Sequence, residues 1–300
     1  MSTPPAASEA LAVTTFGPTS DGPAVLAVHG ITANGRSWNT VAAHLGALRI
    51  IAPDLRGRGR SNRMPGPYGL RRHAADLAAL LDADGGGART VLGHSMGAFV
   101  TVALAAARPD LVERLVLVDG GFPLALPATA VGIDDLDVAA LLGPAAQRLS
   151  MDFADDDAYL DFWRAHPAFR DDWSTAVEDY ARYDLDGEPP HRRASTVVAA
   201  MLEDGAELYG PAWYVEALRA LRMPVTVLRA PRGLTDADPL YAAGALDAFR
   251  DLVPQLEVIE VDDVNHYTIL FAHRGAARVA AAASASSAAP ASEPTTKESP

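Results

Sequence analysis

The sequence predicts an α/β fold in which a mostly parallel central sheet is flanked by helices and interrupted by a helical insertion. Short apolar runs that suit strands buried on both faces alternate with segments of helical periodicity. This alternation is typical of a parallel sheet covered by helices. A run of helical segments without a buried strand then separates two parts of the pattern. The 300 residues, 49% of them apolar, suffice for a large core.

Each element follows from local spacing. Apolar runs predict strands, and a spacing of three to four residues between apolar side chains predicts helices. Proline and glycine mark the ends of several elements. The predicted strands cover residues 11–16, 25–28, 49–52, 90–92, 115–118, 224–229 and 256–261. The predicted helices cover residues 38–48, 70–81, 98–108, 238–252 and 267–283.

The chain divides into two interleaved parts. Residues 11–121 and 222–283 carry the strand and helix alternation and form the expected core. Residues 122–221 combine many acidic residues with regularly spaced aromatic ones, which predicts a helical lid that is acidic outside and aromatic inside. Residues 1–10 and 284–300 are rich in small residues and proline, and they are expected to be disordered.

The composition and charge of the chain limit the classes of function and partner that are expected. The formal net charge of −13 disfavours nucleic acid and anionic membranes as partners. Without cysteine the chain has no disulfide, thiolate metal site or cysteine nucleophile. No secretion signal and no apolar run of membrane-spanning length is visible, so a cytoplasmic location is expected. The oligomeric state is left open.

The stretch Gly93-His94-Ser95-Met96-Gly97 follows a predicted strand and precedes a predicted helix. A serine on so sharp a turn is exposed to a base, and flanking glycines avoid steric collision. His266, on a loop after the last predicted strand, is the expected base. The N–H of Met96 lies at a helix N-terminus and the N–H of Ile31 follows Gly30, so both are expected to bind an oxyanion.

Together with His29-Gly30, Asp54-Leu-Arg-Gly-Arg-Gly-Arg-Ser61, Leu115-Val-Leu-Val-Asp119 and Asn265-His266, this set resembles the α/β-hydrolase superfamily over about residues 11–280. The resemblance implies a Ser95 nucleophile, a His266 base and no metal or organic cofactor. A serine at position 95 argues against the branches of the superfamily that use an aspartate nucleophile.

The third member of the triad is open, because the turn after residues 224–229 has no carboxylate at the family's usual place. Asp236 is preferred, at a normal interval before His266, and Asp119 and Asp238 are the alternatives. Two charged runs receive structural interpretations. The arginines between residues 56 and 63 are expected to brace the loop that carries Ile31 rather than bind an anion, and residues 155–157 are expected to start a helix rather than bind a metal.

The expected activity is that of a serine hydrolase that cleaves a small carboxylic ester or lactone through an acyl-enzyme. Two alternatives stay open at the level of sequence. One is a cofactor-free perhydrolase or haloperoxidase with the same fold. The other is a non-catalytic ligand-binding protein that retains the hydrolase fold.

Overall fold

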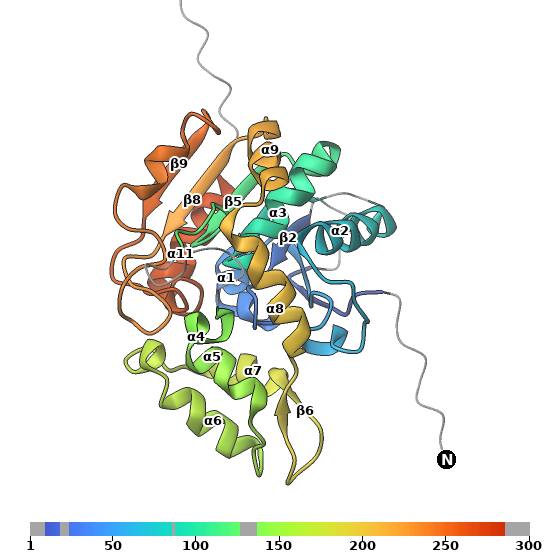
Figure 1. Ribbon diagram of the computed structural model, residues 1–300, viewed down its shortest axis with the longest axis vertical. Coiled ribbons are helices and arrows are strands. Elements are labelled where there is room, and N and C mark those ends of the chain that lie inside the picture. The colour runs from blue at the N-terminus through green and yellow to red at the C-terminus, as the bar shows by residue number, and fades with distance from the viewer. Residues whose placement is uncertain (1–9, 19–23, 86–87, 127–136, 286–300) are drawn as a thin grey trace, which may run out of the picture.

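The structure is a computed structural model that describes residues 10–18, 24–85, 88–126 and 137–285. The residues expected to be disordered therefore lie mostly outside the described ranges. A seven-stranded sheet forms the centre of the molecule, in the order β1-β3-β2-β4-β5-β8-β9 (Figure 1). Among the described strand pairs of this sheet, only β1–β3 is antiparallel. The strands of this sheet are β1 (Val13–Phe16), β2 (Ala24–Val28), β3 (Arg49–Pro53), β4 (Ala88–His94), β5 (Arg114–Val118), β8 (Val225–Arg229) and β9 (Leu256–Glu260).

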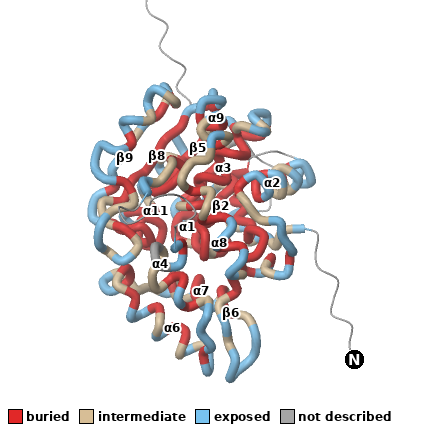
Figure 2. The backbone as a smooth tube through the Cα atoms, in the orientation of Figure 1, coloured by how far each residue is buried: buried red, intermediate tan, exposed pale blue. Residues whose placement is uncertain are grey.

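Helices cover both faces of the sheet, as the fold class requires. On one face, α2 (Leu70–Asp84), α3 (Met96–Ala107) and α9 (Ala212–Ala220) pack into one apolar cluster. On the other face, α1 (Asn39–Leu45), α10 (Thr268–Phe271) and α11 (His273–Ser284) form a second cluster. The inner strands β2, β3, β5 and β8 are mostly buried between these layers, whereas the edge strands β1 and β9 are partly exposed (Figure 2). The predicted α/β class with a mostly parallel sheet is thereby confirmed.

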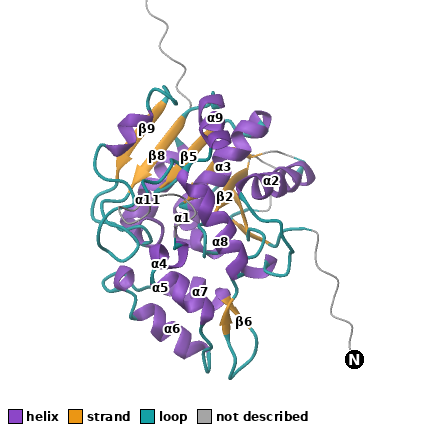
Figure 3. Cartoon of the chain, viewed as in Figure 1, coloured by secondary structure: helices purple, strands orange, loops and turns teal. Residues whose placement is uncertain are grey.

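Between β5 and β8 the described residues form helices joined by loops and one two-stranded hairpin, β6 (Leu185–Asp186) with β7 (Arg193–Ala194) (Figure 3). Its helices are α4 (Val138–Leu142), α5 (Pro144–Gln147), α6 (Asp156–Arg164), α7 (Thr175–Asp184), α8 (Val198–Ala206) and the α9 already given. We call the described residues between β5 and β8 the insertion. Helices α4 to α7 lie at one end of the molecule, whereas α9 packs on α3 in the core (Figure 1).

The aromatic side chains of the insertion are mostly inside it. Trp163, Tyr159 and Phe169 are fully buried and meet edge to face or tilted, with Trp163 at the centre of the group. The acidic run 155–157 starts α6, where the Asp155 side chain accepts a hydrogen bond from the Ala158 N–H at 2.8 Å. The interpretation of this run as a helix start is confirmed.

One predicted helix is wrong. Residues 238–252 contain only a short 3₁₀ segment, Ala245–Phe249. Gly244 has φ +75°, a left-handed conformation that no α-helix continues through. The carbonyl of Tyr241 accepts a hydrogen bond from Nε of Arg229 in β8 instead of a helical N–H. The last helix is also divided, because Ala272 between α10 and α11 has an extended backbone.

Candidate active site

The turn between β4 and α3 holds Ser95 in a strained conformation, with φ 53° and ψ −126°. Close packing around the turn leaves no room for a Cβ at the positions two residues before and two residues after Ser95, where the chain has glycine. A Cβ on Gly93 would lie 2.5 Å from the Cα of Ala98, and one on Gly97 would overlap the carbonyl oxygen of Val28. A serine held in a rarely populated backbone conformation at a tight turn points to function, because the surrounding contacts must offset the strain.

His266 lies on the loop after β9, and its Nδ1 is 2.6 Å from Oδ2 of Asp119. Asp119 is fully buried at the end of β5, and its Oδ1 accepts a second hydrogen bond from the N–H of Ala230 at 3.1 Å. Ser95 and His266 line the same small cavity. The structure therefore brings together Ser95, His266 and Asp119, the arrangement of a nucleophile, a base and an orienting carboxylate.

The preference for Asp236 is corrected by this geometry. The Oδ1 of Asp236 binds Nε of Arg232 at 2.7 Å and Nδ2 of Asn265 at 2.9 Å, and no contact with His266 is found among the described residues. The side chain is 36% exposed. Asp238 is exposed on the same loop. The carboxylate turns toward Asn265 because Arg232 and Asn265 pair as a β-bridge, which brings the two partners of Asp236 side by side.

The loop after β2 carries Ile31 and is fixed by His29. Nδ1–H of His29 donates to the carbonyl of Gly30 at 2.8 Å, and Nε2 accepts from the N–H of Leu55 at 2.9 Å. Burial is the largest cause that lowers the pKa of His29, to about 3, so the ring stays neutral. The peptide group is planar and trans, so fixing the Gly30 carbonyl also fixes the direction of the Ile31 N–H.

The two residues expected to bind an oxyanion, Ile31 and Met96, both lie next to Ser95, one across the cavity and one along the chain. Ile31 lines the same cavity as Ser95, and a Cβ on Gly30 would lie 3.1 Å from the Cβ of Ser95. Met96 is the first residue of α3, so its N–H has no partner four residues earlier in the helix. The cavity has room for about one water molecule, at about 20 Å³.

A larger apolar cavity of about 190 Å³ adjoins the first across Ile31, Leu142 and Leu234. Its walls come from the loop after β2, the insertion and the loop after β8, and no charged residue is found among the described residues that line it. The site also shows no metal centre, since the described residues contain no group of three His, Cys, Asp or Glu side chains that could hold an ion.

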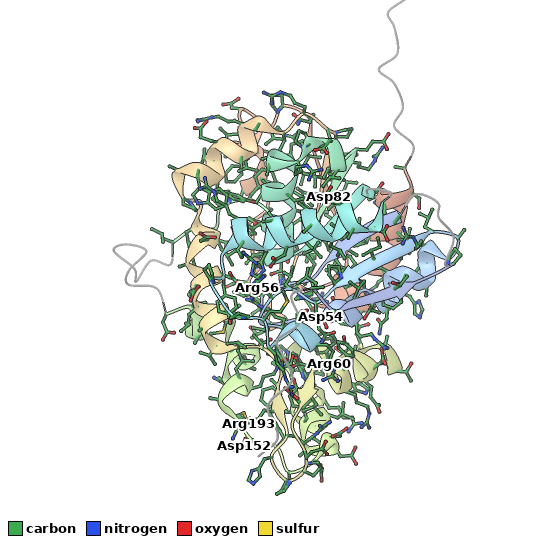
Figure 4. All side chains as sticks on the ribbon, turned by 90° about the vertical axis from the view of Figure 1, so that its right-hand side faces the viewer. Asp54, Arg56, Arg60, Asp82, Asp152 and Arg193 are labelled. Atoms are coloured by element: carbon green, nitrogen blue, oxygen red, sulfur yellow. The ribbon has the colours of Figure 1, made fainter. Side chains whose placement is uncertain are left out.

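The arginine loop braces the site, as expected. Nε of Arg58 donates to the carbonyl of Ile31 at 2.9 Å, and Arg56 binds Asp76. Asp54 accepts hydrogen bonds from the N–H groups of Gly35 and Arg60, and burial is the largest cause that raises its pKa. Figure 4 shows Asp54, Arg56 and Arg60 near one another between the core and the insertion.

Sequence reasoning missed a buried polar group in the insertion. Arg148, Tyr159 and Asp184 are fully buried and mutually hydrogen-bonded. The signal was present in α7, where Val177, Tyr180, Ala181 and Asp184 follow the helical spacing of one face. An aspartate on such an apolar face must have a buried partner.

Comparison with known protein families agrees with the fold and the geometry of this site. The alpha/beta hydrolase fold model matches residues 23–272. The chain belongs to the alpha/beta hydrolase fold family. Within the described ranges, no helix is both long and apolar enough to cross a membrane.

Several relatives of the family are named hydrolases. The chain is 28% identical over 247 residues to 2-(acetamidomethylene)succinate hydrolase of Mesorhizobium japonicum, covering 82% of each protein. It matches a crystal structure of E-2-(acetamidomethylene)succinate hydrolase with a TM-score of 0.75 and 25% identity, over 91% of this chain and 94% of that one.

Another relative has a higher sequence identity to this chain, but over a shorter stretch. Lipase LipV of Mycobacterium tuberculosis is 49% identical over 110 residues, which cover 36% of this chain and 41% of the lipase. The matches to the first four curated relatives span only 30 to 41% of their lengths. The family and these hydrolase, lipase and esterase relatives support a hydrolytic function.

Proposed function

We propose that this protein is a serine hydrolase that cleaves a small, uncharged carboxylic ester or lactone through an acyl-enzyme on Ser95. The observation that carries the proposal is the 2.6 Å contact between His266 Nδ1 and Asp119 Oδ2 beside a serine in a strained turn. A serine hydroxyl is a weak nucleophile unless a positioned base removes its proton, and an oriented imidazole is such a base.

In the first step, the Ser95 oxygen attacks the substrate carbonyl while Nε2 of His266 takes the hydroxyl proton. Buried Asp119 accepts a hydrogen bond from Nδ1–H, which selects the tautomer with a free Nε2 and stabilises the imidazolium that forms. His266 then protonates the leaving alcohol oxygen. Water activated by the same imidazole hydrolyses the acyl-enzyme and regenerates Ser95.

The N–H groups of Ile31 and Met96 would hold the negative oxygen of each tetrahedral intermediate. Both are backbone donors in rigid surroundings, and Met96 adds the positive end of the α3 dipole. Loss of one such donor lowers the rate about 100- to 1000-fold in other serine hydrolases.

The apolar cavity indicates the size and polarity of the substrate. A volume of about 190 Å³ holds about six groups the size of a water molecule or methylene, at about 30 Å³ each. Apolar walls favour a short aliphatic or cyclic group and oppose a charged one. The 2-(acetamidomethylene)succinate hydrolase relative is named for a dicarboxylate. In this chain the buried Arg148 is already bound to Asp184 and to the carbonyl of Thr32, so we do not propose a dicarboxylate substrate.

The test is a panel of aryl esters with acyl chains of graded length, of lactones and of dicarboxylate amides, assayed with wild type and Ser95→Ala. We expect turnover that is greatest for acyl chains of about six carbons or fewer and that Ser95→Ala abolishes. A fluorophosphonate should label wild type and not the variant. Activity that survives Ser95→Ala would refute the acyl-enzyme, and a preference for dicarboxylates would refute the substrate class.

A variant of the cavity provides the matched test of size. Leu208 lines the apolar cavity and not the cavity that holds Ser95. Leu208→Trp should shift the preference toward shorter chains and leave the kcat for acetyl esters near that of wild type. An unchanged chain-length profile would show that the acyl group binds elsewhere.

A further inference from the structure

Three side chains hold the loop that carries Ile31 by binding three successive backbone carbonyls. His29 binds the carbonyl of Gly30, Nε of Arg58 binds that of Ile31 at 2.9 Å, and Nη2 of Arg148 binds that of Thr32 at 2.6 Å. Arg58 comes from the core, whereas Arg148 comes from the insertion, between α5 and α6. Two cationic side chains from different parts of the chain therefore bind neighbouring carbonyls of this loop.

Both arginines are fully buried, and each is neutralised by a buried aspartate of the insertion. Asp204 of α8 is 2.5 Å from Nη1 of Arg58, and Asp184 at the end of α7 is 3.0 Å from Nη2 of Arg148. Burial is the largest single influence on the pKa of Asp204 and raises it, but the attraction of Arg58 and the hydrogen bonds from His73 and the Gly69 N–H together outweigh burial, so the pKa of this carboxyl lies below its usual value.

The two ion pairs are joined through Ser195. Its hydroxyl donates to Oδ1 of Asp184 at 2.6 Å and accepts from the N–H of Gly59, next to Arg58, at 3.0 Å. Tyr159 also donates to Asp184 and accepts from Nε of Arg148. The network therefore runs continuously from the insertion to the loop of Ile31.

Stability alone does not account for such a network. A buried ion pair contributes little net stability, since desolvation offsets the attraction and apolar residues often replace it without loss. Its geometric contribution is larger, because charge-assisted hydrogen bonds fix the direction of a carbonyl. If the Ile31 or Thr32 carbonyl turned, it would lose a buried cationic donor.

We propose that Arg148 with Asp184, and Arg58 with Asp204, are positioning residues that fix the two peptide groups following the Ile31 N–H and thereby keep this N–H from rotating away from the oxyanion. The insertion then completes the oxyanion site and does not merely cover the substrate. This inference rests on the proposed function, since it assigns a task to residues that touch neither Ser95 nor substrate.

The experiment separates positioning from stability. Arg148→Met leaves Asp184 buried without its cation and should lower both Tm and kcat. In the double variant Arg148→Met with Asp184→Asn no buried charge is left unpaired, so Tm should return toward wild type. The Thr32 carbonyl still lacks its donor, so kcat should stay about 10- to 100-fold below wild type, less than the loss of an oxyanion donor itself. KM should change little.

Two further variants complete the design. Arg182→Met removes ion pairs on the exposed side of α7, with Glu178 and Asp157, and is the matched control with unchanged kcat. Arg148→Lys keeps the charge beside Asp184 but lacks the planar fork that binds several acceptors at once. It should fold and turn over about 10-fold more slowly, a tenth of the smallest loss expected for a missing donor.

The outcomes distinguish this inference from the proposed function. Wild-type kcat in a folded double variant, or in Arg148→Lys, would overturn the inference while leaving the serine hydrolase intact. Failure of fluorophosphonate to label wild-type Ser95, with no ester turnover, would instead overturn the proposed function. A fall in labelling rate that parallels the fall in kcat across the variants would support positioning of the oxyanion donor.

Discussion

Replacing Asp119 by asparagine should nearly abolish turnover, and replacing Asp236 should not. The carboxylate of Asp119 is fully buried and 2.6 Å from Nδ1 of His266, so solvent does not screen the interaction. An asparagine fits the same space but can present its NH₂ group to the ring, which favours the wrong tautomer. In a serine protease the equivalent substitution lowers kcat about 10⁴-fold, which corresponds to about 5 kcal/mol in the barrier.

Asp236 offers a matched comparison. Its side chain is 36% exposed, and its ion pair with Arg232 is of a kind that contributes no more than about 1 kcal/mol, or about 5-fold in any rate it influences. Steady-state kinetics on one ester should therefore separate Asp119→Asn from Asp236→Asn by about three orders of magnitude. Melting curves serve as the control for folding. Equal activity of the two variants, both folded, would refute the assignment of Asp119.

Two further predictions concern stability. Burial is the largest cause that lowers the pKa of His29 to about 3, of His166 to about 4 and of His94 well below its usual value, so the unfolded chain binds protons that the folded chain does not. The free energy of unfolding should therefore fall as the pH drops below about 6.5, by about 2 kcal/mol per histidine at pH 5. Tm should decline steeply between about pH 7 and 5. A Tm that does not change with pH over this range would contradict the burial of these histidines. Gly97→Ala should yield little folded protein, because the added Cβ would overlap the carbonyl oxygens of Val28 and His29, and a wild-type melting curve would contradict the tight turn.

Local patterns were sufficient to predict the sheet and the tight turn that holds Ser95. The spacing of the glycines around Ser95 and the position of His266 after the last strand depend on contacts within a few residues, which a sequence displays directly. The segment 238–252 has helical spacing too, yet its backbone follows distant partners. Nε of Arg229 takes the carbonyl of Tyr241, and the Tyr241 hydroxyl binds the backbone of Phe122.

The acid of the candidate triad could not be chosen from the sequence for a related reason. Asp119 and Asp236 both follow strands that end at the same edge of the sheet, β5 and β8. Which carboxylate turns toward His266 depends on how the loops after β8 and β9 meet. That meeting is fixed by the β-bridge between Arg232 and Asn265, a contact between residues 33 positions apart that no local pattern announces.

The burial of Arg148 could not be predicted from the composition of the insertion. An acidic segment with scattered arginines is usually a solvated surface, and several of its ion pairs are exposed, such as Arg193 with Asp152 (Figure 4). Asp184 differs only in its place on the apolar face of α7, and Arg148 lies outside any long helix. Their pairing over 36 residues appears only when the insertion is folded onto the loop of Thr32.

The position of Asp119 also changes which parts of the site can move independently. Ser95 and Asp119 follow neighbouring strands, the Ser95 N–H donates to the carbonyl of Val118 at 2.9 Å, and a Cβ on Gly120 would overlap the backbone of Ser95. The proposed nucleophile and the proposed acid are therefore rigidly connected to each other. His266 alone arrives on a separate loop.

Side chains from two other parts of the chain hold that loop. His94 donates from Nε2 to the carbonyl of His266 at 2.8 Å, and Asn265 is held by Asp236 at 2.9 Å. Asp236 thus supports the histidine through its neighbour rather than through the imidazole. A carboxylate in this position tolerates substitution better than Asp119, because Oδ1 of Asn265 still accepts hydrogen bonds from the N–H groups of Tyr267 and Thr268 when Asp236 is lost.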